Sequence, residues 1–191
     1  MKNKISISTL IIFLILIIPT FILAQNLYNL NTSSFKLYSS ALMNSGTIPL
    51  NNVSSKEYKG KDMSVPLSWS GAPEGTKSFA IFMYDLNPAS KDYVHWTVVN
   101  IPSNISEIKE GASMTIDLPK GAMELTNSSG LFRYSAPCPP VGSGSHEYKL
   151  IIYALSTDKL TMTAPSTLKK FQTAIEGNVL ASSEVSGFFG N

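Results

Sequence analysis

Cysteine is almost absent from this sequence of 191 residues. The single Cys138 excludes an intramolecular disulfide, so packing has to stabilise the fold even outside the cell. Charged residues are also scarce, at 15%, and the basic ones form no stripe along the chain. The pair Lys169 and Lys170 is typical of a solvated helix face. These absences argue against nucleic acid as a partner.

Only the N-terminus carries a long, almost purely apolar run. Lys2 and Lys4 precede apolar residues 9–18, and Ala24 is followed by polar residues. This order predicts an export signal over residues 1–24. The signal is either cleaved after Ala24 or retained as an anchor, because residues 5–24 are long enough to span a bilayer. We therefore expect a protein that is secreted, periplasmic or tethered to the outer face of the cytoplasmic membrane.

Residues 35–191 are expected to form one domain, preceded by a polar lead-in over residues 25–34. Apolar runs rich in β-branched and aromatic residues alternate with Gly/Pro clusters, which predicts a sheet-built core. A further short strand is expected at residues 35–38, and residues 51–61 are expected to form a surface loop. The main strands are expected at residues 65–69, 79–84, 95–101 and 148–155.

One helix is predicted near the C-terminus. Thr163 is suited to cap it and Pro165 to its first turn. Its apolar face has helical spacing and comprises Leu168, Phe171, Ile175 and Val179. Core packing explains this stripe, and Gly177 is expected to interrupt the helix.

Three polar clusters interrupt the apolar strands, and they contain both histidines of the chain. Asp85 follows a buried strand, and His95 opens the next one. His146 lies in a third cluster, a Pro/Gly loop that runs from Tyr134 to Tyr148. We expect Asp85 to lie beside His95, since a carboxylate fixes the tautomer of an imidazole. Backbone N–H groups of a Gly-rich loop can complete a small anion-binding pocket.

The order and spacing of several motifs make the chain resemble the phosphatidylethanolamine-binding protein family, and especially its bacterial and archaeal Raf-kinase-inhibitor-like branch. The resemblance covers residues 35–191. It rests on residues 66–71 with 75–78, the Asp85 loop, residues 95–102, Tyr134 with residues 137–140, residues 146–148, and residues 177–181 with 187–189.

The resemblance implies a mainly β fold with a central antiparallel sheet, a second smaller sheet and short helices. It also implies a small pocket for phosphate-like anions, including phospholipid headgroups, in a protein that is not an enzyme and has no cofactor. By motif position the pocket residues are Asp85, His95, Tyr134, His146 and Tyr148. Cys138 and Pro139 match the rim, and Gly142 belongs to the Gly-rich part of the same loop.

Three positions depart from the family pattern. The loop after Asp85 has Asn87 and a shifted Pro88, so a second carboxylate is lost. Residues 126–130 replace an Asn-Asp-Phe-Gly type run. The C-terminal residues 187–189 lack a tyrosine that is often found there. The pocket is thus better supported than any particular ligand.

Other functions remain open from the sequence. The chain is suited to act as an inhibitor through surface loops, and an exported protein would meet a protease more readily than a kinase. Asp85, His95 and His146 have the ligand types of a metal site, but not a known spacing. A Ser-His-Asp hydrolase is the third hypothesis, although no Gly-x-Ser-x-Gly elbow is present. The oligomeric state, including a homodimer, stays open.

Overall fold

The protein is described here by a computed structural model that covers residues 35–90, 93–162 and 167–191. The predicted signal or anchor, the lead-in, Thr163 and Pro165 lie outside these residues. Within them, no helix combines the length and the apolar character that a membrane span needs.

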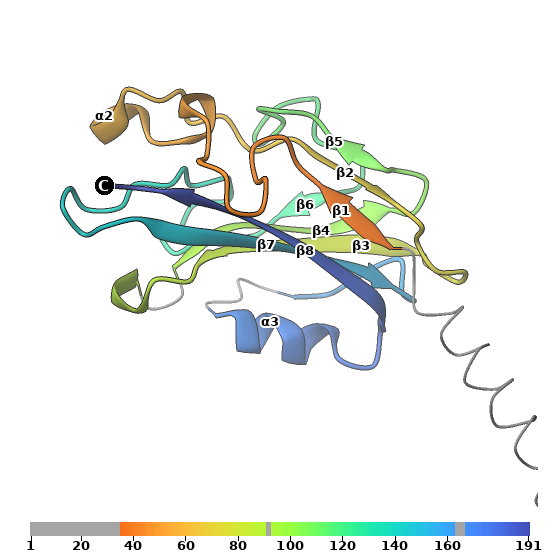
Figure 1. Cartoon of the computed structure of the whole chain (residues 1–191). Helices are drawn as coiled ribbons and strands as arrows, with labels where there is room; N and C mark the ends of the chain where they lie inside the picture. Colours follow the sequence, from red (N-terminus) through yellow and green to blue (C-terminus); the bar gives the residue numbers. More distant parts are fainter. Residues whose placement is uncertain (1–34, 91–92, 163–166) are drawn as a thin grey trace, which may run out of the picture. The chain divides into compact units, whose positions relative to one another are not determined.

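Two antiparallel sheets form the domain, as the sequence predicted (Figure 1). The larger has five strands in the order β6-β4-β3-β7-β8, and the smaller has the order β1-β2-β5. The strands of the larger sheet are β3 (Ser78–Asp85), β4 (Val94–Pro102), β6 (Met123–Glu124), β7 (His146–Leu155) and β8 (Val179–Phe189). Those of the smaller sheet are β1 (Lys36–Tyr38), β2 (Leu67–Ser70) and β5 (Glu107–Ile108).

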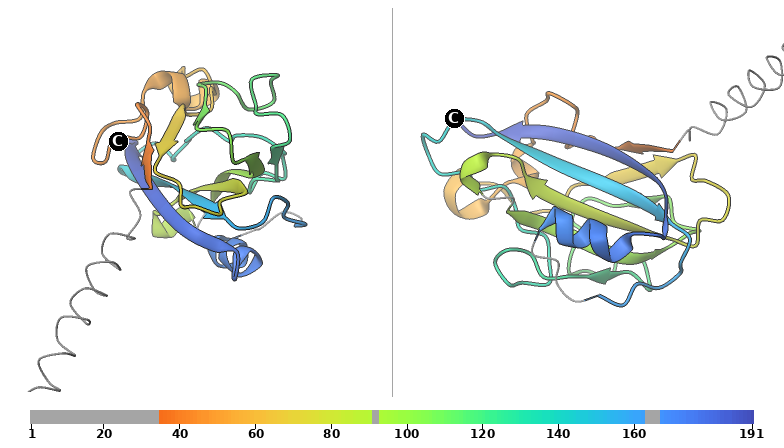
Figure 2. Two further views of the ribbon diagram at one scale, coloured as in Figure 1. Left: turned by 90° about the vertical axis from the view of Figure 1, so that its right-hand side faces the viewer. Right: turned by 90° about the horizontal axis from the view of Figure 1, so that it is seen from below.

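The central strand β3 is buried along its whole length, which explains its continuous apolar sequence. Alternate side chains serve two separate cores. Phe79 faces the smaller sheet, where its ring lies 5.8 Å from Phe35 and 5.3 Å from Trp69. Phe82 faces the other side and stacks on Phe171 of α3 at 4.9 Å. The larger sheet is therefore the middle layer of three (Figures 1 and 2).

Helix α3 (Leu168–Ile175) is shorter than predicted. Its N-cap is Thr167, whose side chain accepts a hydrogen bond from Lys170 N at 3.2 Å. It ends before Gly177, which has a φ of 80°. Val179, which the sequence analysis assigned to the helix face, instead opens β8. The prediction was wrong there because the apolar spacing continues past the turn.

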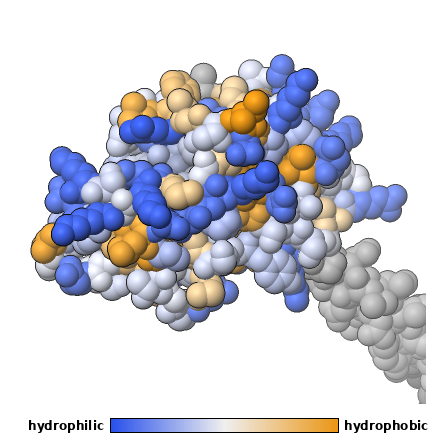
Figure 3. All heavy atoms as spheres, turned by 90° about the horizontal axis from the view of Figure 1, so that it is seen from above, coloured by the Kyte–Doolittle hydropathy of each residue, from blue (hydrophilic) through white to orange (hydrophobic). Residues whose placement is uncertain are grey.

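Three short helical elements had not been located from the sequence. The region expected as a loop contains a 3₁₀ turn, η1 (Leu50–Asn52), and one turn of helix, α2 (Ser55–Tyr58). A second 3₁₀ turn, η2 (Pro88–Ser90), follows β3. The face seen from above mixes hydrophilic and apolar side chains (Figure 3). The apolar side chains of the described residues on this face are scattered and form no large patch. The polar loops at the end of the larger sheet are therefore the candidate location of a functional site.

Candidate functional site: a two-histidine pocket

A pocket of about 280 Å³ lies at the end of the larger sheet where β3 ends and β4 and β7 begin. Asp85, the last residue of β3, lines the pocket together with Ala89, Ser90 and Tyr93 of the segment that follows. Strands β4 and β7 contribute His95, His146 and Tyr148. The loop that leads into β7 contributes Ser135, Ala136, Cys138, Pro139, Pro140 and Ser143.

A β-bulge places His95 on the pocket wall. Met83 pairs with Trp96 and Tyr84 pairs with Val94, so His95 is the extra residue between two register positions. An extra residue of this kind re-aims a side chain next to a site. His95 Nδ1 lies 2.6 Å from the carbonyl oxygen of Ser135. Because a carbonyl only accepts, Nδ1 carries the proton and Nε2 bears the lone pair of a neutral ring.

Burial keeps His95 uncharged near neutral pH. The side chain is 4% exposed, and desolvation lowers its pKa to about 4. The hydrogen bond to Ser135 and the charge of Asp85 oppose this shift, and His146 adds to it. The Nε2 atom of His95 is therefore a hydrogen-bond acceptor on the pocket wall.

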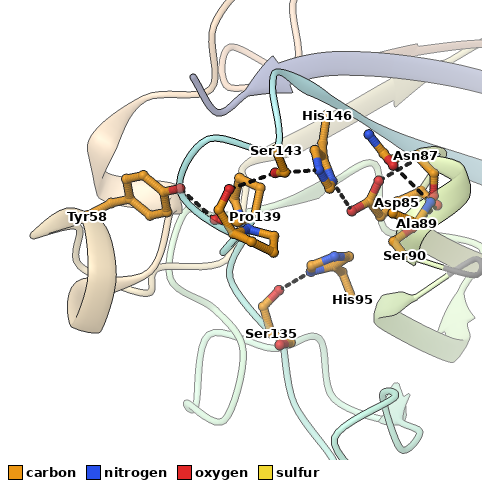
Figure 4. Close-up of polar contacts among 11 residues, drawn as sticks. Tyr58, Asp85, Asn87, Ala89, Ser90, His95, Ser135, Pro139, Ser143 and His146 are labelled. Carbon is orange, nitrogen blue, oxygen red and sulfur yellow. Dashed lines mark hydrogen bonds and ion pairs between the residues drawn. The ribbon is translucent and has the colours of Figure 1, made fainter.

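Asp85 pairs with His146 and not with His95, which corrects the pairing expected from the sequence. Asp85 and Tyr148 are register partners on β3 and β7, and His146 precedes Tyr148 by two residues. Side chains two residues apart share one face of a strand. Asp85 Oδ2 thus lies 2.7 Å from His146 Nδ1, and the carboxylate accepts the Nδ1 proton (Figure 4). His95 meets a backbone carbonyl instead.

The altered loop after Asp85 is closed by its own hydrogen bonds. Asp85 Oδ1 accepts from Asn87 N at 2.8 Å, and Asn87 Oδ1 accepts from Ala89 N at 2.9 Å. Ser90 Oγ donates to the carbonyl oxygen of Asn87 at 2.6 Å. The residue that replaces the second carboxylate thus caps a turn. Both oxygens of Asp85 are thus hydrogen-bonded within the protein.

The two predicted tyrosines have different positions. Tyr148 lines the pocket, with its ring centroid 5.1 Å from that of His95 and 6.3 Å from that of His146. Burial raises the pKa of its phenol, so the hydroxyl remains a donor. Tyr134 is not among the lining residues. Its hydroxyl donates to Asn52 O at 2.8 Å, and its ring packs edge-on against Trp96. Tyr134 is a core residue in this structure.

The loop that carries Cys138 and Pro139, here called the rim loop, is also held by contacts outside the pocket. Tyr58 of α2 donates to Pro139 O at 2.6 Å and packs edge-on against Phe189 of β8. Cys138 is exposed and lines the pocket as a free thiol. Gly142 has a φ of 80° in the turn that follows, so it shapes the loop without lining the pocket. Of the predicted site residues, Cys138 and Pro139 line the pocket, whereas Gly142 and Tyr134 do not.

Several lining residues had not been singled out from the sequence. Tyr93 hydrogen bonds to Ser129 through its hydroxyl, and its ring lies 4.9 Å from that of His95. Ser143 Oγ lies 3.0 Å from His146 Nε2 and donates to Pro140 O at 2.6 Å. The signal for Ser143 is its place between two glycines, three residues before His146.

The charges of the pocket constrain its ligands. Among the described residues that line it there is no lysine or arginine. The described part of the chain also has no group of three His, Cys, Asp or Glu side chains able to hold a metal ion. Among these described residues a phosphate dianion would meet hydrogen-bond donors and the His95 acceptor, but no permanent cation. A ligand that brings a proton to His95 fits this arrangement better.

Comparisons with known proteins agree with this architecture. A family model described as phosphatidylethanolamine-binding protein matches residues 38–190. The UPF0098 protein YbcL of Escherichia coli K12 is 35% identical over 130 residues, which are 66% of this chain and 71% of that protein. A UPF0098 protein of Methanothermobacter thermautotrophicus is 35% identical over 130 residues, 68% of this chain and 84% of that protein.

Two solved structures show the fold. The crystal structure of Escherichia coli YbcL, described as a new member of the mammalian PEBP family, matches with a TM-score of 0.75 and 31% identity. The match covers 83% of this chain and 99% of that one. A carboxypeptidase Y inhibitor, solved with its cognate proteinase, matches with a TM-score of 0.54 and 14% identity over 83% of this chain and 84% of that one. This second likeness concerns the fold alone.

Proposed function

We propose that this chain, which belongs to the phosphatidylethanolamine-binding protein family, binds a phosphate monoester or phospholipid headgroup in the two-histidine pocket. Family membership confirms the resemblance seen in the sequence and supports a binding role in general. Proteins of this family generally act by binding rather than by catalysis. The ligand class is our own inference from the geometry of the site.

The main observation is that a hydrogen-bond acceptor and a donor face one pocket from β4 and β7, the two strands that flank β3. His95 Nε2 is the acceptor, because its Nδ1 is bound to Ser135. The Tyr148 hydroxyl is the donor, and it makes no hydrogen bond with another described residue. A singly protonated phosphate monoester has both complements, a P–OH group for His95 and P–O⁻ oxygens for Tyr148. A phospholipid phosphate is a diester without a P–OH group, so there the ethanolamine ammonium is the donor for His95.

The size of the pocket favours a headgroup over a whole lipid. Its volume of about 280 Å³ is at the lower end for small-molecule sites. A phosphate with a short amino alcohol fits within such a volume, whereas acyl chains would have to remain outside. A free ester and a lipid headgroup would therefore place the same group in the pocket, the phosphate with its ethanolamine.

Calorimetric titration of the full-length protein with inorganic phosphate, phosphorylethanolamine and sulfate tests the proposal. We expect phosphorylethanolamine to bind more tightly at pH 5.5 than at pH 8, because the second pKa of a phosphate monoester is about 6 and its dianion lacks a P–OH group. Inorganic phosphate keeps a P–OH group as its dianion, so its binding should depend less on pH. Sulfate, which stays deprotonated, should bind more weakly than either. His95→Ala and Tyr148→Phe should each weaken binding, whereas Ser145→Ala, a change on the exposed loop, should not.

Vesicles separate the two sources of the ligand. Co-sedimentation with phosphatidylethanolamine vesicles that is lost in His95→Ala would assign a lipid headgroup, and binding of phosphorylethanolamine alone would assign a free ester. Equal phosphate binding by wild type and His95→Ala would refute the proposal. Inhibition of a serine protease that survives both pocket substitutions would instead support the protein-partner alternative.

A further inference from the structure

Three side chains at one edge of the pocket form a continuous chain of hydrogen-bonding groups (Figure 4). Asp85 Oδ2 lies 2.7 Å from His146 Nδ1, and His146 Nε2 lies 3.0 Å from Ser143 Oγ. The carboxylate takes the Nδ1 proton, which leaves Nε2 of the neutral ring as an acceptor directed at the serine. A carboxylate, an imidazole and a serine hydroxyl linked in this order can activate the serine as a nucleophile. Such a triad is recognised by its geometry rather than by the position of its residues in the sequence.

The base of this arrangement is rigid. His146 and Asp85 are 2% and 4% exposed, and the second oxygen of Asp85 is bound to Asn87 N. The ring therefore cannot turn away from Ser143 without breaking a buried hydrogen bond. Asp85 acts through His146 as a positioning residue.

The serine is presented by a tight turn. Gly142 and Gly144 flank it with φ values of 80° and 84°, a conformation that side-chain-bearing residues rarely adopt. Ser143 N donates to Pro140 O at 3.0 Å, and Gly144 N donates to Asn191 O at 3.2 Å. Ser143 itself is exposed and lines the pocket. A ligand in the pocket therefore reaches Oγ, although no strand-to-helix elbow is present.

We propose that Ser143 is a nucleophile, with His146 as its general base, toward small acyl esters that enter the pocket. Ser143 Oγ attacks the carbonyl carbon and its proton moves to His146 Nε2. The ester C–O bond breaks, and the leaving alkoxide takes that proton. Water then attacks the acyl-serine with His146 again as base, which releases the carboxylic acid and restores Ser143.

Two features of the site predict slow turnover. Ser143 Oγ also donates to Pro140 O at 2.6 Å, so its proton has a second acceptor that competes with His146. The Tyr148 hydroxyl lines the same pocket and is a candidate donor to the oxyanion, whereas efficient acyl transfer uses more than one such donor. A covalent adduct is therefore a better readout than the rate of product release.

Labelling of the full-length protein tests the proposal. A fluorophosphonate, whose P–F bond is exchanged for a P–O bond to the serine, is followed by intact mass and peptide mapping. p-Nitrophenyl acetate is used in the same way to trap the acyl-serine. We expect one adduct with each reagent, located at Ser143. Ser143→Ala should lose it, and Ser145→Ala, the matched change two residues away on the same loop, should keep it. Both positions are exposed, so both variants should fold.

His146→Gln adds a kinetic readout, with its melting temperature as a check on folding. Loss of the general base should slow labelling of Ser143 by about 100-fold. No adduct in the wild type, or equal labelling in Ser143→Ala, would overturn the proposal. Phosphate binding is measured separately, so failure of labelling leaves the binding function intact, and failure of binding leaves the nucleophile intact.

Discussion

The two walls of the pocket hold their histidines in different ways. On the β4 wall, a bulge directs His95 inward and a backbone carbonyl binds its Nδ1. On the β7 wall, regular register brings His146 to Asp85, and Nε2 reaches a serine. One ring depends on a neutral partner and the other on a charged one. The comparison teaches that two histidines in one pocket can have separate chemical roles and separate sensitivities to mutation.

The carboxylate of the β7 wall should carry the largest single effect. Asp85→Ala leaves His146 buried without its acceptor, and we expect the free energy of unfolding to fall by about 3 kcal/mol. Urea denaturation followed by tryptophan fluorescence measures it. The matched control is Asp117→Ala, whose partner Lys109 is exposed, and it should lose less than about 1 kcal/mol. Equal losses would show that burial of the Asp85–His146 pair does not add to its contribution to stability.

The β4 wall should respond to pH. Burial lowers the pKa of His95 to about 4, against about 6.5 in the unfolded chain. The unfolded state therefore binds a proton first, so stability is retained above pH 6.5 and falls as the pH drops from there to about 4. This difference corresponds to about 3 kcal/mol in total. Denaturation at pH 7 and pH 4.5 measures most of it.

His95→Gln removes that titration and serves as the comparison. The variant should lose less stability than the wild type between the two pH values, although its stability at pH 7 is lower. A pH dependence identical to that of the wild type would mean that His95 is not held neutral by burial.

Much of the fold was predictable because its central strands are continuous apolar runs. Residues 79–84 and 148–155 were placed correctly for this reason, and they became β3 and β7. Strand β8 was missed since it lies at the sheet edge, where polar side chains such as Ser183 and Glu184 interrupt any apolar run. An edge strand with one solvated face gives a weak local signal, and its partner β7 determines its position.

The site was predictable in composition but not in pairing. His146 and Asp85 are separated by 61 residues, and only the β3–β7 register brings them together. The bulge at His95 is likewise a property of two strands and not of one segment. The position of Tyr134 was not predictable either, because a motif position alone does not tell whether a hydroxyl faces a pocket or a backbone carbonyl in the core.

Removing one hydroxyl at a time sharpens the contrast between the two tyrosines. Tyr148→Phe should weaken phosphorylethanolamine binding by about tenfold, the loss expected for one hydrogen bond to a charged group, with little change in stability. Tyr134→Phe should do the reverse and cost about 1 kcal/mol of unfolding free energy, because Asn52 O loses its donor. Calorimetry and urea denaturation on both variants separate the two roles. A loss of affinity in Tyr134→Phe alone would contradict the assignment.

The smallest effect is expected at the rim. Tyr58→Phe removes the hydrogen bond to Pro139 O but keeps the ring against Phe189, so we expect a stability loss of about 1 kcal/mol or less. The consequence should be local, because that bond joins α2 to the loop that carries Cys138 and Ser143 on the pocket wall. Hydrogen exchange should become faster at residues 138–145 and stay unchanged in β3. Tyr38→Phe, on an exposed tyrosine of β1, is the matched control and should leave the rim loop protected. Faster exchange throughout the larger sheet would instead show that Tyr58 stabilises the whole domain. The effect of its hydrogen bond would then not be local to residues 138–145.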